Sequence, residues 1–252
     1  MAFPNEVVTA EPVLQNLASL EAPFRKESLT GTFVFGDPAT GPLKVWNPAR
    51  AKKREIPAST FKIANTVIGL ETGAVKTIDE VLPYGGKPQW MKEWEHDMPL
   101  REAMPLSAVP IYQELARRVG LERMQASVTK LHYGNGRIGQ VVDRFWLDGP
   151  LEISPVEQVD FLGRLLRGQL PVSDAAVAGV KEILPKTALG TATVRYKTGW
   201  STNSKPQLGW LVGWLETADG KTTPFALNID MPTQDLAAKR LPLALACLEI
   251  AK

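Results

Sequence analysis

The chain has 252 residues, 44% of them hydrophobic and 22% charged, which are the proportions of a soluble globular protein. Its formal net charge of +2 is too close to balance to suggest nucleic acid or a membrane surface as a partner. The single cysteine, Cys247, excludes an intrachain disulfide, and two histidines without a close His/Cys cluster lead us to expect no metal site.

The sequence gives limited information about compartment. It contains no run of 18 apolar residues, so we expect no transmembrane helix. Glu6 and Glu11 interrupt any apolar core of a signal peptide. Two interpretations stay open from the residues alone: a cytoplasmic protein, or an exported protein whose signal peptide has been removed.

The predicted elements begin with a helix over residues 12–20 and a hairpin made of residues 31–37 and 42–46. Residues 59–72 predict a helix that is apolar nearly all round, which is typical of a buried helix. Further helices are predicted over residues 99–104, 107–119, 121–131, 154–168 and 173–184, strands over 191–198, 207–216 and 223–231, and a last helix over about 234–250.

This order predicts an α+β fold, in which an antiparallel sheet is flanked by terminal helices and joined to a helical lobe. We expect a single domain over residues 1–252, with a sheet lobe of about 1–58 and 190–252 and a helical lobe of about 59–189. A cleft between two lobes is the usual place for a ligand site.

The segment Ser59-Thr60-Phe61-Lys62 is the first candidate for chemistry. The S-x-x-K pattern is weak by itself, because Ser127-Val128-Thr129-Lys130 matches it too. Context separates the two copies: Lys62 is the only charged residue from Ile56 to Leu70. Lys130 is expected on a polar, exposed helix face, with Glu122 and Arg123 nearby. A buried unpaired ammonium is costly and tends to lose its proton. Lys62 could therefore serve as a base for a nucleophilic Ser59 on the same helix face.

The motif and its neighbours resemble those of class D (oxacillinase-type) serine β-lactamases over residues 20 to 250. Pro57-Ala58-Ser59-Thr60-Phe61-Lys62-Ile63 is similar to the family's active-site motif. Five later elements occur in the family's order: Ser107-Ala108-Val109, Tyr133-Gly134-Asn135, the tryptophan loop Phe145 to Leu151, Lys197-Thr198-Gly199, and Arg240 ten residues after Asp230. Each element is weak alone, and the ordered set is specific.

The resemblance implies a role for each matching residue. The expected catalytic residues are Ser59, Lys62, Ser107, Trp146 and Lys197, and the expected substrate-binding residues are Val109, Leu147, Thr198, Gly199, Trp200 and Arg240. No metal or cofactor is implied, but Lys62 is expected to carry a carbamate formed from carbon dioxide, with the Trp146 indole as its hydrogen-bond donor. The Ser59 and Trp200 N–H groups would stabilise the oxyanion. The implied substrate is a small β-lactam, in a periplasmic or secreted protein.

Simpler structural roles stay open for single residues. Ser59 and Ser107 could be helix N-caps, Lys62 a lysine whose ammonium reaches solvent, and Trp146 an ordinary core residue. Lys197 and Arg240 could be exposed, and Tyr133-Gly134-Asn135-Gly136 could be only a turn. Two other functions also fit the motifs: a β-lactam sensor domain that stays acylated, or a DD-peptidase, although such peptidases usually carry asparagine where Val109 stands.

Overall fold

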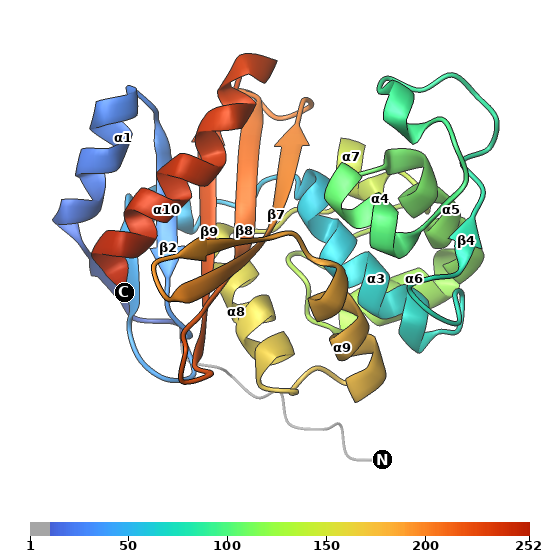
Figure 1. Cartoon of the computed structure of the whole chain (residues 1–252), viewed down its shortest axis with the longest axis horizontal. Coiled ribbons are helices and arrows are strands. Elements are labelled where there is room, and N and C mark those ends of the chain that lie inside the picture. Colours follow the sequence, from blue (N-terminus) through green and yellow to red (C-terminus); the bar gives the residue numbers. More distant parts are fainter. Residues whose placement is uncertain (1–10) are drawn as a thin grey trace.

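The computed structural model describes residues 11–252, so Glu6 lies outside the described residues. In the described part of the chain, the main sheet has the strand order β1-β3-β2-β9-β8-β7-β6 (Figure 1). Its strands are β1 (Leu14–Asn16), β2 (Gly31–Phe35), β3 (Leu43–Trp46), β6 (Lys186–Leu189), β7 (Ala192–Ser201), β8 (Leu208–Glu216) and β9 (Thr222–Asp230). All neighbours pair antiparallel except β1 and β3.

Helices cover both faces of the sheet and form a lobe beside it (Figure 1). One face carries α1 (Glu21–Glu27) and α10 (Arg240–Ala251), and α8 (Pro155–Leu166) covers the other. The lobe contains α3 (Lys62–Glu71), α4 (Leu100–Leu106), α5 (Val109–Val119), α6 (Leu121–Lys130), α7 (Phe145–Asp148) and α9 (Asp174–Ile183). No helix within residues 11–252 is both long enough and apolar enough to cross a bilayer.

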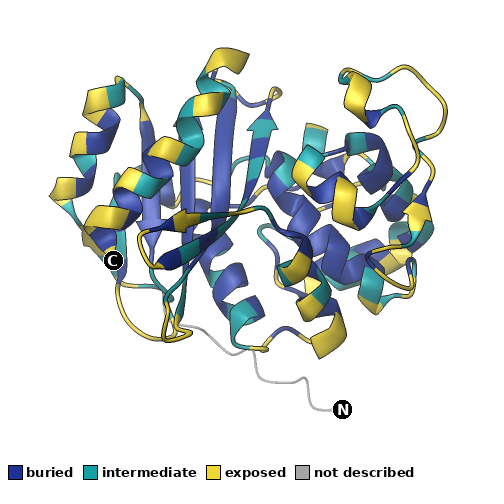
Figure 2. Cartoon of the chain, in the orientation of Figure 1, coloured by how far each residue is buried: buried dark blue, intermediate teal, exposed yellow. Residues whose placement is uncertain are grey.

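Short elements complete the chain. They are α2 (Pro48–Ala51), the 3-10 helices η1 (Ala18–Leu20), η2 (Ala58–Phe61), η3 (Lys92–Trp94) and η4 (Gln234–Lys239), and the strands β4 (Val81–Leu82) and β5 (Met98–Pro99), which pair with each other. Burial follows the layers: the strands of the sheet and α3 are largely buried, while the outer turns of the helices are exposed (Figure 2).

The predicted α+β fold with its helical lobe is confirmed. The hairpin forms with Val34 opposite Val45. Helix α8 begins with a capping box, in which the Ser154 hydroxyl accepts from the Glu157 N–H and the Glu157 carboxylate accepts from the Ser154 N–H. The buried helix predicted over 59–72 starts with the 3-10 turn η2 and continues as α3.

Three boundaries differ from the prediction. The helix expected over residues 12–20 is wrong, because Leu14–Asn16 pairs with β3 as strand β1 and η1 follows it. Helix α5 begins at Val109, since Ser107 has a left-handed backbone with φ of 57° and lies in the turn after α4. Strand β6 enters the sheet at Lys186, before the expected start of the sheet lobe at residue 190.

Candidate active site

Ser59 and Lys62 meet at the start of the most buried helix of the lobe. Ser59 lies in η2, and Lys62 is the first residue of α3. The Lys62 Nζ donates a hydrogen bond of 2.8 Å to the Ser59 Oγ. Ser59 does not cap the helix, because Pro57 holds the N-cap position of η2. The pair therefore has the geometry of a nucleophile and its neighbouring base.

Lys62 has an unusual electrostatic environment. Its side chain is 0% exposed, so it does not reach solvent. Burial lowers the pKa of Lys62 from 10.5 to about 7. Burial is the one cause of this shift, because no carboxylate of the described residues pairs with Lys62. The Nζ lies over the Tyr112 ring, 5.2 Å from its centroid. A large share of Lys62 is therefore a neutral amine near neutral pH.

The second copy of the pattern lacks this environment. Lys130 is exposed at the end of α6, and Ser127 lies in the middle of the same helix. The prediction that Lys130 lies on an exposed face is confirmed. Burial thus distinguishes Ser59 and Lys62 from a chance match.

Ser107, in the turn after α4, and Lys197 of β7 form a second serine–lysine pair. The Lys197 Nζ donates 3.0 Å hydrogen bonds to the Ser107 Oγ and to the Thr198 carbonyl oxygen. Lys197 is only 1% exposed, and its pKa lies well below the usual value because of burial and the positive charges of Lys62 and Arg240. These contacts exclude an exposed strand lysine at 197 and an N-cap at 107, since Ala108 is the N-cap of α5.

Strand β7 lies beside Ser59 on its β6 side, beyond Arg195, where the pairing with β6 ends. A Cβ added to Gly199 would lie 3.3 Å from the Ser59 N and 3.1 Å from the Pro57 O, so a residue without a side chain suits this approach. The Tyr196 N–H donates to the Pro185 O on the β6 side. Because N–H directions alternate along a strand, the Trp200 N–H points to the same edge.

Arg240 is attached to the sheet and is not a freely solvated residue of the last helix. Its guanidinium donates to the Gly199 O at 2.7 Å and to the Trp210 O at 3.4 Å, while its Nε donates to the Ala237 O. Burial lowers the pKa of Arg240 to about 10. A guanidinium held beside Gly199 and Lys197 provides a positive site for a carboxylate.

Trp146 is fully buried in α7, where its ring stacks on Phe61 with centroids 5.6 Å apart. Its Nε1–H is a buried donor without a hydrogen-bond partner among the described residues. Buried donors are rarely left unpaired in native proteins. This N–H can therefore donate to an acceptor that the described residues do not supply.

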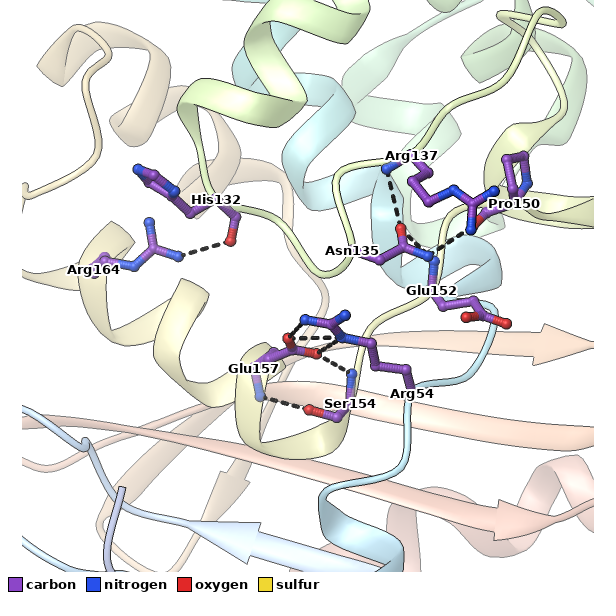
Figure 3. Close-up of polar contacts among 9 residues, drawn as sticks. All are labelled: Arg54, His132, Asn135, Arg137, Pro150, Glu152, Ser154, Glu157 and Arg164. Atoms are coloured by element: carbon purple, nitrogen blue, oxygen red, sulfur yellow. Dashed lines mark hydrogen bonds and ion pairs between the residues drawn. The ribbon is translucent and has the colours of Figure 1, made fainter. Parts of the chain in front are cut away.

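The Tyr133-Gly134-Asn135 segment is more than a turn, because it holds the chain that follows α7. A Cβ on Gly134 would lie 2.1 Å from the Glu152 O. The Asn135 amide donates to the Pro150 O, and its Oδ1 accepts from the Glu152 and Arg137 N–H groups (Figure 3). Nearby, Arg54 pairs with Glu157 of the α8 capping box (Figure 3). The contacts of Asn135 hold Pro150 and Glu152, which directly follow the helix that carries Trp146.

Known proteins resemble this chain along most of its length. The model of the penicillin binding protein transpeptidase domain matches residues 30–248. The chain is 41% identical over 243 residues to beta-lactamase OXA-5 of Pseudomonas aeruginosa, covering 95% of this chain and 90% of the relative. It is 43% identical over 189 residues to beta-lactamase OXA-48 of Klebsiella pneumoniae, covering 75% of this chain and 71% of that relative.

A solved structure agrees in fold as well as in sequence. It is the crystal structure of FUS-1 (OXA-85), a class D β-lactamase from Fusobacterium nucleatum subsp. polymorphum, with a TM-score of 0.88 and 39% identity. The alignment covers 94% of this chain and 98% of that one. The chain belongs to the class D β-lactamase family.

In this class D chain, some residues near the site were not predicted from the sequence. Tyr112 lies under Lys62 and exchanges a 3.0 Å hydrogen bond with the Thr66 hydroxyl. The Asn203 amide donates to the Leu147 O at 3.2 Å and to the Asp148 Oδ1 at 2.9 Å. Val109 and Leu147, both expected near the substrate, are partly buried against the core of the helical lobe. No group of three or more potential metal ligands occurs within residues 11–252.

Proposed function

We propose that this protein hydrolyses β-lactams through an acyl-enzyme on Ser59. The observation that carries the proposal is the 2.8 Å contact between the Ser59 Oγ and the fully buried Lys62 Nζ, in a chain of the class D family. A serine needs a neighbouring base to become a nucleophile, and a lysine whose pKa is lowered can provide one as its neutral amine.

The surrounding residues supply the other parts of acyl transfer. Ser59 attacks the β-lactam carbonyl carbon, and the Ser59 and Trp200 N–H groups stabilise the oxyanion. Ser107, hydrogen-bonded to Lys197 at 3.0 Å, passes a proton to the leaving nitrogen. Arg240, Lys197 and Thr198 bind the substrate carboxylate. Val109 and Leu147 are apolar groups beside the path of the hydrolytic water.

We also propose that Lys62 is carbamylated. Only a neutral amine attacks carbon dioxide, and the pKa of Lys62 near 7 provides that form. The unpartnered Nε1–H of Trp146, which stacks on Phe61 beside Lys62, is available to an anionic group. The carbamate supplies an anionic oxygen base, for the Ser59 proton in acylation and for water in deacylation.

Intact mass spectrometry over time with benzylpenicillin tests the reaction. We expect a transient adduct of the whole penicillin on the wild type, its decay to unmodified protein, and turnover of a chromogenic cephalosporin. Ser59→Ala should form no adduct, while Ser127→Ala, in the second S-x-x-K copy, should behave as the wild type.

The other outcomes distinguish the competing functions. An adduct that persists without turnover indicates a sensor domain, and release of D-alanine from a D-Ala-D-Ala peptide indicates a DD-peptidase. An unmodified wild type would overturn the acyl-enzyme altogether. We further propose a periplasmic or secreted location for such an enzyme, which fractionation of the native host tests.

A further inference from the structure

The short turn η2, which carries Ser59, does not hold its conformation by itself. It has four residues, and Pro57 at its N-cap makes no side-chain hydrogen bond to it. Ala58, directly before Ser59, has a left-handed backbone with φ of 49°. This region is unfavourable for a residue with a Cβ and persists only where neighbouring structure fixes it. The turn therefore depends on contacts from other elements.

The two carbonyl groups at the start of this turn are held by hydrogen bonds. The Trp210 Nε1–H of β8 donates to the Ile56 O at 3.0 Å. The Pro57 O accepts from the Thr60 hydroxyl at 2.8 Å and from the Thr60 N–H at 3.2 Å. A Cβ added to Gly199 would lie 3.1 Å from the Pro57 O, so this carbonyl also lies close to β7. Its position therefore helps to set the gap between the turn and the strand.

Gln158, in the first half of α8, reaches the same turn through Thr60. Its Nε2 donates to the Thr60 Oγ1 at 2.8 Å, and each of the two side chains is 1% exposed. An amide nitrogen can only donate, and a hydroxyl has a single proton. The Thr60 hydroxyl therefore accepts from Gln158 and donates its proton to the Pro57 O. The result is a directed chain of hydrogen bonds from α8 to the carbonyl two residues before Ser59.

Aromatic rings surround this chain of hydrogen bonds. The Tyr133 ring packs edge-on against Phe61, with centroids 5.4 Å apart, and against Phe161 of α8, with centroids 5.0 Å apart. Burial raises the pKa of the Tyr133 phenol, and its neighbours Thr60 and Gln158 lower this pKa in part. Hydrogen bonds are stronger in such low-dielectric surroundings, where solvent does not compete for them.

We propose that Gln158 is a positioning residue for the nucleophile Ser59, acting through the Thr60 hydroxyl. This inference rests on the proposed function. By fixing the Pro57 O, the hydroxyl holds the turn that presents the Ser59 Oγ and N–H to the substrate, opposite the Trp200 N–H. Small displacements of reacting atoms slow attack strongly. Removing the Gln158 donor should therefore slow acylation without weakening substrate binding.

Single-turnover acylation by benzylpenicillin, quenched and followed by intact mass, tests the proposal. Gln158→Met keeps the length of the side chain and removes its donor. We expect the limiting acylation rate constant, measured on the Ser59 that becomes labelled, to fall about 10-fold, the value of one buried hydrogen bond. The substrate concentration at half the limiting rate should change less than about twofold.

A double-mutant cycle tests the route through Thr60. Thr60→Val removes the hydroxyl, keeps both branches at Cβ, and should lower the rate about as much as Gln158→Met. In the Thr60→Val background, Gln158→Met should cause less than about a twofold further loss, because the group through which it acts is already absent. Thr60→Ser keeps the hydroxyl and should retain more of the rate than Thr60→Val. Losses that multiply independently would overturn the route.

Thr32→Val is the matched control, since Thr32 is a fully buried threonine of β2 whose hydroxyl also donates to a backbone carbonyl, that of Trp46. It should lower the melting temperature and leave the acylation rate unchanged. A Gln158→Met protein with a wild-type acylation rate would overturn the positioning role and leave the hydrolase proposal intact. If Gln158→Met does not fold, equal rates for Thr60→Val and Thr60→Ser would overturn that role. A wild type that forms no adduct would overturn both proposals.

Discussion

The Lys62 Nζ donates to the Ser59 Oγ at 2.8 Å while its side chain is completely withdrawn from water. The Nζ also lies over the face of the Tyr112 ring, 5.2 Å from its centroid. Folding therefore places a basic group where its charged form is poorly solvated. This arrangement favours reactivity at the expense of stability.

Replacing Lys62 by methionine should stabilise the fold near neutral pH. The pKa of Lys62 is about 7 when folded and 10.5 as the reference value, so between these pH values the unfolded chain binds a proton that the folded chain lacks. The free energy of unfolding then rises with pH across this window, and the cost of Lys62 is greatest below pH 7.

The gain in the free energy of unfolding for Lys62→Met should reach up to about 5 kcal/mol below pH 7, at about 1.4 kcal/mol for each pKa unit, and should shrink toward pH 10.5. Chemical denaturation of both proteins in bicarbonate-depleted buffer measures this difference. A constant difference across the pH range would contradict a depressed lysine pKa.

The turnover rate should fall both when bicarbonate is removed and when the pH is lowered. Protonation of Lys62 below its pKa of about 7 removes the neutral amine that reacts with carbon dioxide. We expect kcat to fall in depleted buffer and at acidic pH, and added bicarbonate to restore it above pH 7. Initial rates with a chromogenic cephalosporin provide the readout. Initial rates that do not change with bicarbonate concentration would contradict a carbamate on Lys62.

Trp146→Phe should separate catalysis from stability. The substitution keeps an aromatic ring on Phe61 and removes only the Nε1–H, which has no partner among the described residues. The melting temperature should therefore stay or rise, while deacylation slows about 10- to 100-fold, the value of one hydrogen bond to a charged group. Adduct lifetime by intact mass tests this. A lower melting temperature with normal deacylation would indicate a purely structural tryptophan.

Asn203 should matter for activity more than for stability. Its amide holds the Leu147 O and the Asp148 Oδ1 of α7, the helix that carries Trp146. Asn203→Ala should lower the free energy of unfolding by less than about 1 kcal/mol, because the side chain is exposed. It should lower kcat several-fold. Hydrogen exchange of residues 144–149 should increase. The neighbouring Thr202→Ala is the control and should show none of these changes.

Two glycines of one turn should respond differently to alanine. Gly134 and Gly136 both have positive φ, 54° and 70°, so both substitutions strain the backbone. Only at Gly134 does the added Cβ meet backbone, 2.1 Å from the Glu152 O, whereas at Gly136 it meets nothing within 4 Å. We expect Gly136→Ala to lower the free energy of unfolding by about 1 kcal/mol, and Gly134→Ala to lower it clearly more. Urea denaturation measures both. Equal losses would mean that the chain at Glu152 moves away freely.

Much of the fold follows from local pattern. The charge-free run around Lys62 predicts its burial, because one ammonium among apolar residues must enter the core together with its helix. The two runs 31–37 and 42–46, separated by the turn residues Asp37-Pro38 and Gly41, predict the hairpin. Residues 12–20 fail this reasoning: their strand exists only because β3 offers a parallel partner there, and no local periodicity encodes that partner.

Some features of the site also follow from local sequence, and others depend on how distant elements pack. Sequence alone determined that Ser59 and Lys62 share one turn of helix, since three residues of spacing fix that proximity. The tertiary structure decided that Lys197 meets Ser107, 90 residues away, that the Trp146 N–H is left without a partner, and that Gln158 reaches Thr60. Such contacts depend on how separate elements pack, which no spacing along the chain specifies.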